Sequence, residues 1–430
     1  MTRSRAALVV GLVLLTAFAV LQETSTQDES RLALTRSLVT HGSVRIDRWH
    51  DTEDRAFFGG HWYTDKAPGL SIAAIPAYGV ERAVGGTPNP WHGRWSRYLV
   101  RLLVNGPLLA LVVLLVGRRA EAMASGSGLL VGVAAALGTI LGALASILFD
   151  HVGAAALAFA AFVLAFGDPP RYAWAGALAG AAVLFDYSSG LVLATLAVAV
   201  ALGGLRPLTR YAAGAAGPLV VLGLYDLAAF GSPFHLSYRY VQNHFADEQH
   251  SGLFGIGLPS IQDLRAVLVG GSGLHIGSGV LVTSPLLLAS AVGLVLMWRR
   301  GLRREGAVIA VVSLLYLVYD AGYFLPYGGT SPGPRFLAVA LPFAVLPVAE
   351  VARRRRLVAV AAVAVSVAVS TADLIVWFYN NGIHFDVLPP TIWSSLGLSR
   401  TAGVVVVFVT AALALAAACL PAQLHFQRET

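Results

Sequence analysis

The stretch YLVRLLVNGPLLALVVLLVGRR, residues 98–119, determines the class of fold to which this chain belongs. Its apolar part, residues 98–117, has about the 20 residues that a helix needs to cross a hydrocarbon core of ~30 Å. Arg118 and Arg119 follow directly, and membrane proteins concentrate arginine in the short loops that stay in the cytoplasm. The stretch therefore predicts a membrane-spanning helix whose C-terminal end faces the cytoplasm.

The composition of the whole chain also predicts a membrane protein. Of its 430 residues, 57% are hydrophobic and only 12% are charged, and the mean hydropathy is +0.70. A soluble protein of this length carries more charge, so a multi-span membrane protein is expected. The net charge of +7 does not indicate a nucleic-acid partner, because the basic residues lie in short clusters between apolar runs. The single cysteine, Cys419, excludes an internal disulfide.

Apolar runs recur along the chain and predict an all-α, polytopic fold with about twelve membrane-spanning helices. The runs are 6–21, 98–117, 129–149, 152–167, 172–187, 190–204, 211–230, 278–297, 306–325, 336–351, 357–377 and 401–420. Arg3 and Arg5 place the N-terminus in the cytoplasm, and an even number of spans returns the C-terminus to the same side. Residues 1–430 contain no internal repeat or flexible linker, so we expect a single integral membrane domain.

The longest predicted extracytoplasmic segment is the first loop, residues 22–97. Within it, residues 70–84 are apolar, but this run is short and contains Pro76. Counting it as a span would place the later arginine clusters outside, so we expect a helix that lies along the outer membrane surface. The apolar run at 6–21 has features of a membrane anchor and also of a cleaved signal peptide. A charged loop of this size favours chemistry at the outer surface.

The start of this loop contains a candidate catalytic carboxylate. The sequence TSTQDESRLALTRSLVTHG, residues 24–42, predicts a helix that ends at Gly42. Thr26 followed by Glu29 has the pattern of a capping box, which explains Glu29 structurally. Asp28 has no such structural explanation. Because neighbouring side chains on a helix point about 100° apart, Asp28 and Glu29 cannot serve one reacting centre equally. We therefore expect Asp28 to act as general base, with Glu29 as a second catalytic candidate.

Lys66 is the one lysine among the 30 basic residues counted as lysine or arginine. It lies in GHWYTDKAPG, residues 60–69, just after a predicted hairpin in which Phe57-Phe58 and His61-Trp62-Tyr63 flank two glycines. A lysine ammonium is a compact charge that suits a phosphate group. Lys66 is therefore a candidate phosphate ligand, with a simple surface ion pair to Asp65 as the alternative.

Two later polar sites complete the set of candidates. Asp150-His151 lies between two apolar runs, where an ionisable residue is either functional or caps a helix at a tight turn. Arg335, in YGGTSPGPRFLAVALPF, either binds phosphate or extends along the membrane interface. The histidines of residues 231–277 lack metal-ligand spacing, so no metal is predicted from them.

These motifs resemble the C-superfamily of membrane glycosyltransferases (GT-C), in particular the bacterial aminoarabinose transferases of lipid A and the protein O-mannosyltransferases. The matching stretches are DESRLALTRSLVTHG, WYTDKAPG, LFDHVGAAALAF and PGPRFLAVALPF. The first three cover about residues 28–165 in the order found in that family. Residues 63–68 reproduce the family's Tyr-x-x-Lys-Pro-like stretch with Ala67 inserted before the proline. The resemblance implies a GT-C-like fold with juxtamembrane helices in the first loop.

The resemblance also implies roles for the candidate residues. Asp28 would act on the acceptor nucleophile, and Asp150 would be the second extracytoplasmic acid. Lys66 would contact the lipid phosphate of the donor. The remaining candidate ligands of the donor phosphate are Tyr63, His151 and Arg335.

The predicted function is the transfer of a sugar from a polyprenyl-phosphate donor to an acceptor hydroxyl at the outer face of the bacterial cytoplasmic membrane. The expected acceptor is an envelope glycan, lipid or protein, and membrane lipids are further partners. No cofactor is required by the motifs, although a divalent cation near Asp150 is compatible with them. A transporter or flippase for a lipid-linked or anionic solute, or a non-catalytic scaffold, would use the same charges without bond breaking and stays open.

Overall fold

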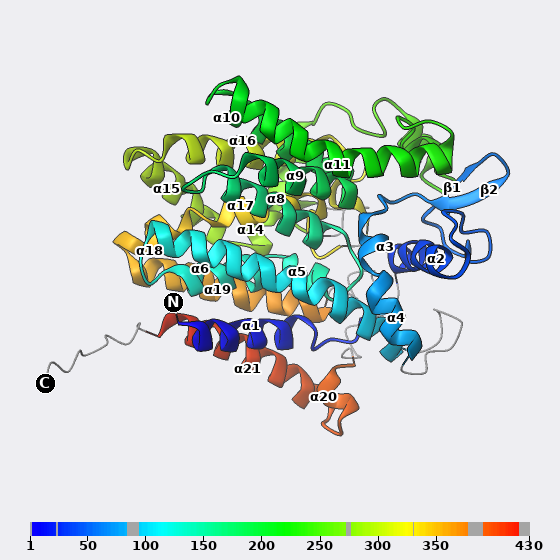
Figure 1. Ribbon diagram of the computed structural model, residues 1–430. Coiled ribbons are helices and arrows are strands. Elements are labelled where there is room, and N and C mark those ends of the chain that lie inside the picture. Colours follow the sequence, from blue (N-terminus) through cyan, green and yellow to red (C-terminus); the bar gives the residue numbers. More distant parts are fainter. Residues whose placement is uncertain are drawn as a thin grey trace, which may run out of the picture.

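The computed structural model describes residues 2–22, 25–83, 94–271, 277–329, 331–376 and 390–420. In this part of the chain the regular structure is almost entirely helical, with two small two-stranded sheets. The helices lie side by side, and the first loop forms a separate group of elements at the end away from the N-terminus (Figure 1). The predicted all-α class is thereby confirmed. Residues 84–93 of the first loop and residues 377–389 lie outside the described residues.

Five helices of the described chain are long and apolar enough to cross a membrane. They are α5 (Arg94–Met123), α11 (Leu205–Phe230), α16 (Arg303–Gly322), α19 (Arg356–Val376) and α21 (Arg400–Cys419). Shorter helices occupy other predicted spans: α1 (Arg3–Ala17), α6 (Gly128–Leu137), α8 (His151–Ala165), α9 (Tyr172–Phe185), α10 (Gly190–Ala201) and α15 (Leu286–Arg299). These helices identify a multi-pass membrane protein, but the predicted number of twelve spans is not confirmed.

Three predicted spans are interrupted in the structure: residues 278–297 divide into α14 (Val280–Thr283) and α15, and two other spans are broken within the core. Residues 336–351 were expected to form one helix and instead form η4 (Arg335–Val339), α17 (Leu341–Val345) and α18 (Val348–Arg354). Pro347 lies between α17 and α18, and proline has no N–H to continue a helical ladder. Residues 129–149 divide at Gly138 into α6 and α7 (Leu141–Ala145). These last two segments are buried in the core, where surrounding protein can satisfy backbone groups that lipid could not.

The first loop contains α2 (Thr26–His41), β1 (Arg55–Phe58), β2 (His61–Thr64), α3 (Gly69–Ala73) and α4 (Ile75–Ala83). The predicted hairpin is confirmed, because β1 pairs antiparallel with β2 and Phe58 is opposite His61. Gly59 and Gly60 connect the strands with φ values of 58° and 83°. Two successive positive φ angles are what a two-residue hairpin turn requires, and glycine adopts them without steric penalty.

Residues 70–83 of the apolar run at 70–84 are helical, as expected, but they form two helices. The break falls at Ala74, between α3 and α4. Pro76 lies two residues later and lacks the N–H that would donate to the carbonyl of residue 72, so the helical hydrogen-bond ladder is interrupted there. α4, which belongs to the first loop, packs against α5 (Figure 1). Its position along the outer membrane surface stays a prediction.

Small residues allow α9 and α11 to pack closely. A Cβ added to Gly176 of α9 would lie 1.9 Å from the carbonyl oxygen of Tyr211 on α11. A Cβ added to Gly214 of α11 would lie 1.8 Å from the carbonyl oxygen of Ala173 on α9. Helices inside a membrane commonly associate through such small residues, because backbone proximity maximises van der Waals contact.

Short helices and strands connect the longer helices in the part of the chain after α9. They are η1 (Tyr187–Ser189), η2 (Ser237–Tyr240), α12 (Ala246–His250), α13 (Ile261–Val269), β3 (Gly270–Gly271), β4 (Gly277–Ser278), α14 (Val280–Thr283), η3 (Pro326–Gly328) and α20 (Ile392–Ser395). The segment from η2 to β3 lies within residues 231–277, here called the second loop. It approaches the first loop, since Val241 forms an isolated bridge with Ala56 of β1.

Candidate active site

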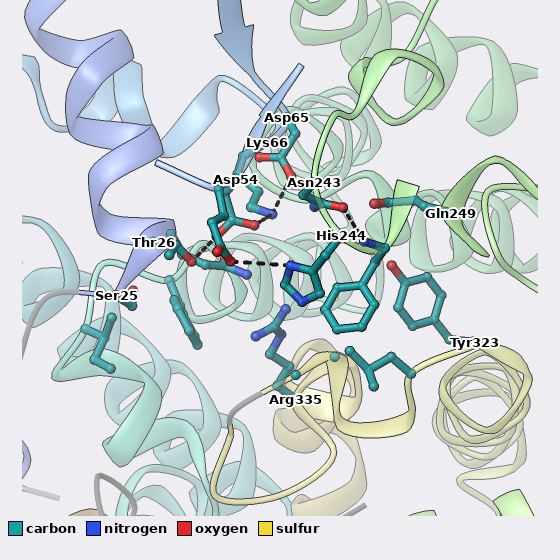
Figure 2. Close-up of a pocket in the computed structure, with 18 of the residues that line it drawn as sticks. Ser25, Thr26, Asp54, Asp65, Lys66, Asn243, His244, Gln249, Tyr323 and Arg335 are labelled. Carbon is teal, nitrogen blue, oxygen red and sulfur yellow. Dashed lines mark hydrogen bonds and ion pairs between the residues drawn. The ribbon is translucent and has the colours of Figure 1, made fainter. Parts of the chain in front are cut away.

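A cavity of about 510 Å³ lies between the first loop, the second loop and the segment 323–335 (Figure 2). Its wall contains two of the predicted phosphate ligands, Lys66 and Arg335. Asp54 and Asp65 line the same cavity. The structure thus brings together two cations that are far apart in the sequence and two carboxylates that the sequence alone did not single out as catalytic.

Lys66 is held between two carboxylates. Its Nζ donates to Asp54 Oδ1 at 2.8 Å and to Asp65 Oδ2 at 2.8 Å. Burial acts to lower the pKa of Lys66, but the two negative charges outweigh burial and raise it. The ammonium is therefore charged at neutral pH and is partly open to the cavity, with 12% of its side chain exposed.

The two carboxylates differ in environment. Burial raises the pKa of Asp65 to about 6, because its side chain is almost fully enclosed and Asp54 adds a second negative charge nearby. Burial acts in the same direction on Asp54, but Lys66 and the hydroxyl of Thr26 both donate to it and hold its pKa below the ordinary value. Asp54 is also the more exposed of the pair, with 15% of its side chain accessible against 1% for Asp65.

Arg335 enters the cavity at the start of η4. Its guanidinium lies over the rings of Phe149 and Phe336, at 5.3 and 5.5 Å from the ring centroids. Its Nε has no hydrogen-bond partner among the described residues, although the residue is buried. Gly328, with φ of +66°, leaves the space that this side chain occupies, because a Cβ there would lie 2.6 Å from Arg335 Nε. The glycine-rich stretch noted in the sequence thus makes room for the arginine.

Aromatic rings and amides form much of the remaining lining. The rings belong to Phe149, Phe245, Tyr323 and Phe324, and the amides to Gln22, Gln27, Asn243 and Gln249. His244 of the second loop lies 3.5 Å from Glu53 of the first loop and connects the two loops at the cavity. Apolar surface combined with a few directed polar groups is typical of pockets that bind small organic ligands.

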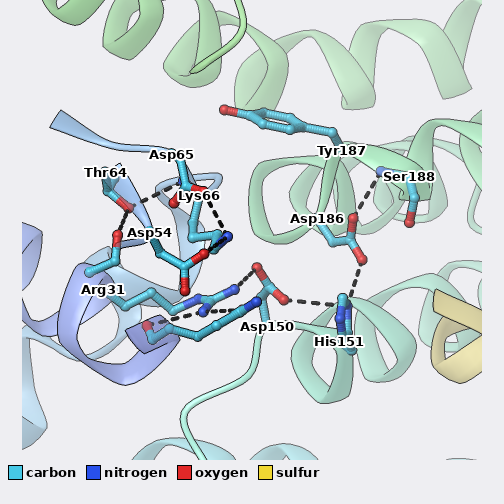
Figure 3. A network of polar contacts seen from close by, with 12 residues as sticks. Arg31, Asp54, Thr64, Asp65, Lys66, Asp150, His151, Asp186, Tyr187 and Ser188 are labelled. Carbon is cyan, nitrogen blue, oxygen red and sulfur yellow. Dashed lines mark hydrogen bonds and ion pairs between the residues drawn. The ribbon is translucent and has the colours of Figure 1, made fainter. Parts of the chain in front are cut away.

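A buried polar network lies beside the cavity (Figure 3). Arg31 of α2 donates to Asp150, which precedes α8, and to the Gln27 side chain at 2.8 Å. His151 Nδ1 lies 2.9 Å from Asp186 Oδ2 and 3.3 Å from Asp150 Oδ1. Asp150 and His151 therefore lie together, as their sequence required, but Arg31 and Asp186 join them only in the fold.

Asp28 lies behind the cavity wall and is fully buried. Its carboxylate accepts two hydrogen bonds from Arg101, both at 3.0 Å, and one from the Leu148 amide at 2.8 Å. Burial opposes its ionisation, but Arg101 outweighs burial and lowers the pKa of Asp28. In this conformation Asp28 links α2, α5 and the segment that leads to Asp150.

The predicted capping box is shifted by one residue. Ser25, rather than Thr26, is the N-cap of α2, and Asp28, rather than Glu29, completes the box. Ser25 Oγ accepts from the Asp28 amide at 3.2 Å, and the Asp28 carboxylate accepts from the Ser25 amide at 2.9 Å. The structural explanation that the sequence gave to Glu29 is wrong and applies to Asp28. Thr26 is free to donate to Asp54.

Two other predicted site residues lie away from the cavity lining. Glu29 is half-buried on α2, and burial raises its pKa to about 7 despite the nearby charge of Arg97. Tyr63 is buried in β2, where its ring packs against Phe230 with centroids 5.3 Å apart. Tyr63 belongs to a small hydrophobic cluster that fixes the hairpin next to α11. Within the described residues, the ammonium of Lys66 bonds to Asp54 and Asp65 and to neither of these side chains.

Asp150, His151 and Asp186 form a group whose ligand atoms lie within 4.8 Å of one another. One imidazole and two carboxylates are ligand types that zinc and manganese accept. However, Arg31 already bonds Asp150, and Asp186 already bonds His151 Nδ1, so an ion would have to replace these contacts. The sequence offered no signal for this group because Asp186 lies 35 residues after His151 and only the fold brings the two together.

No known family model matches the sequence, and no curated protein matches it. Among solved structures, the chain is similar to ArnT from Cupriavidus metallidurans bound to undecaprenyl phosphate, with a TM-score of 0.56 and 14% identity. That match covers 97% of this chain and 77% of ArnT. The apo state of the same protein matches with a TM-score of 0.53 and 16% identity, over 96% and 76% of the two chains. At these identities the likeness shows the fold, and the predicted resemblance to GT-C glycosyltransferases is confirmed at that level.

Proposed function

We propose that this protein transfers a sugar from a polyprenyl-phosphate donor to an acceptor hydroxyl at the outer face of the cytoplasmic membrane. One observation carries the proposal: Lys66 and Arg335 line a single cavity that also contains carboxylates able to accept a proton. Cations favour the charge that develops on a departing phosphate, and a carboxylate can activate the attacking hydroxyl. A shared fold with ArnT, whose crystal structure contains undecaprenyl phosphate, supports this class of donor.

The donor phosphate would bind between the Lys66 ammonium and the Arg335 guanidinium. Both groups prefer anionic oxygen, and guanidinium can bind two phosphate oxygens at once. The aromatic rings and amides of the cavity would hold the sugar and the acceptor. The extracytoplasmic position of the site follows from the arginine clusters of the sequence and is part of the proposal.

In the proposed reaction an acceptor oxygen attacks the anomeric carbon of the donor sugar. The bond between that carbon and the phosphate oxygen breaks, and its electrons leave with the polyprenyl phosphate. A carboxylate takes the acceptor proton, so the products are the glycosylated acceptor, a lipid phosphate and a protonated side chain. Inversion at the anomeric carbon is the outcome that the GT-C resemblance implies.

We propose Asp54 as that proton acceptor, because it lines the cavity and is the more exposed partner of Lys66. Asp28, the candidate from the sequence, would have to exchange its bonds to Arg101 before it could accept a proton. Asp150 is held by Arg31 and would position the wall of the site. The competing assignments of Asp28 and Asp54 give different outcomes in variants, as described in the Discussion.

The experiment compares a deletion strain with strains that express the wild type, Lys66→Ala, Arg335→Ala or Arg48→Ala. Envelope glycans and the pool of polyprenyl-phosphate-linked sugar are measured together. We expect loss of one glycan and accumulation of its donor in the deletion strain and in the Lys66 and Arg335 variants. Arg48→Ala, an exposed substitution elsewhere in the first loop, should behave as wild type.

The alternative functions give other results in the same experiment. If the protein is a transporter or flippase, the cation variants would consume donor at the wild-type rate in permeabilised membranes. The same variants would change the rate at which the solute crosses the membrane of sealed vesicles. A scaffold would leave the envelope unchanged in both cation variants. Either result would overturn the assignment of an enzyme.

A further inference from the structure

A second cavity, of about 500 Å³, lies between α10 and α16. Its sides are apolar and include Val198 of α10, Leu202 directly after that helix, and Val311 of α16. Arg303 and Arg304, the first two residues of α16, close one end of it. The cavity therefore combines a hydrocarbon-like groove with two adjacent guanidinium groups.

The arginine end of this groove lies at the opposite end of α16 from the candidate active site. α16 runs from Arg303 to Gly322, and the next residue, Tyr323, lines the active-site cavity. A helix of 20 residues is about 30 Å long, which equals the thickness of the hydrocarbon core. The arginines thus lie about one bilayer core away from Tyr323 at the active-site cavity.

The charge at this end of the groove is available to a ligand. Arg303 and Arg304 are both exposed, and neither forms an ion pair within the part of the chain that the structure describes. The neighbouring acid, Glu305, is already bonded to Arg119. Adjacent guanidinium groups bind phosphate oxygens through charge-assisted hydrogen bonds.

We infer that this groove binds an anionic glycerophospholipid from the leaflet opposite the active site. Its acyl chain would lie between α10 and α16, and its phosphate would contact Arg303 and Arg304. Basic pockets between membrane-spanning helices recognise anionic head groups in this way. The inference rests on groove shape and charge and does not depend on the proposed sugar transfer.

The test is native mass spectrometry of the full chain released from nanodiscs that contain equal amounts of phosphatidylglycerol and phosphatidylcholine. We expect wild-type protein to retain phosphatidylglycerol with a preference on the order of 30-fold, from two arginines at the membrane surface. Arg303→Gln/Arg304→Gln should lose most of the preference. Ala307→Trp, which fills the groove and keeps both charges, should reduce retention of either lipid.

Arg206→Gln/Arg210→Gln is the matched control, because it removes the same charge from exposed positions of α11 that do not line the groove. It should keep the preference, and thermal unfolding should show that all variants fold. An equal loss of the phosphatidylglycerol preference in this control would show that the arginines act only through overall charge and would overturn the inference. An unchanged preference in the Arg303→Gln/Arg304→Gln variant would exclude the site. Displacement of phosphatidylglycerol by low concentrations of polyprenyl phosphate would assign the groove to the donor and overturn the inference.

Discussion

Lys66 Nζ lies 2.8 Å from Asp54 Oδ1, so the single lysine of this chain holds a carboxylate that lines the candidate active site. A donor phosphate would compete with Asp54 for the ammonium, because both present anionic oxygens to the same cation. Once Lys66 turns to the phosphate, Asp54 loses its strongest partner and becomes a better proton acceptor. Donor binding and activation of the acceptor would then be linked through one side chain.

Asp54→Asn is expected to lower the rate of sugar transfer by about 10²–10⁴-fold, because an amide cannot accept the acceptor proton. Binding of polyprenyl phosphate should stay within a few-fold of wild type. The rate is measured with lipid-linked donor in isolated membranes, and binding is measured on purified protein. Asp51→Asn, an exposed substitution nearby in the first loop, is the control and should be fully active. A fully active Asp54→Asn protein would refute the assignment of the base.

Asp28→Asn is expected to act mainly on stability. The substitution removes a buried charge partner of Arg101, and breaking such a pair typically costs about 3–5 kcal/mol. We expect a lower melting temperature in detergent, together with any loss of activity. If Asp28→Asn instead keeps the wild-type melting temperature and abolishes transfer, Asp28 is the base and the original prediction from the sequence is correct.

Gly328→Ala is expected to weaken binding of the donor phosphate. The added Cβ would lie 2.6 Å from Arg335 Nε and would displace the guanidinium from its position over Phe149. Isothermal titration with polyprenyl phosphate should show weaker binding to Gly328→Ala than to wild type. The same substitution should have a smaller effect on binding in the Arg335→Ala background, where the guanidinium is already absent. Gly42→Ala has a similar positive φ but no atom within 4 Å of its Cβ, so it controls for backbone strain alone.

Glu29 should make stability depend on pH. Its pKa rises from 4.5 to about 7 on folding, chiefly through burial, so the folded protein binds this proton more tightly than the unfolded chain does. The contribution of this proton to the free energy of unfolding is complete below about pH 4.5. It is lost as the pH rises through about 7. Melting temperatures measured between pH 5 and pH 8 should therefore fall with rising pH. The decline should be smaller in Glu29→Gln, and an unchanged profile would show that other groups are responsible.

Chelation of divalent cations is expected to leave transfer within about twofold of the untreated rate. Arg31 already supplies positive charge to Asp150, and His151 already bonds Asp186, so the group is compensated by protein. Membranes treated with EDTA and washed are assayed with and without added Mn²⁺ or Mg²⁺. Loss of activity that either ion restores would show that the Asp150, His151 and Asp186 group holds a metal.

Local patterns were enough to predict several elements of the first loop. Two glycines between aromatic runs predicted the hairpin, because few residues other than glycine adopt two successive positive φ angles. Gly42 predicted the end of α2, and the structure shows it in the left-handed conformation with φ of 59°. The cap at the other end of α2 was placed one residue too late. Ser25 and Thr26 are both good caps, and only packing decided between them.

The sequence by itself determined that this chain is a helical, multi-pass membrane protein with a GT-C-like fold and an unusual lysine in its first loop. Hydropathy and turn chemistry act over a few neighbouring residues, so they can be read without a structure. Only the tertiary structure decided which charges meet: Arg31 with Asp150, Arg101 with Asp28, and Lys66 with Asp54. Each buried charge needs a partner, but many candidates satisfy that need equally in the sequence, and the packing of distant helices selects one of them.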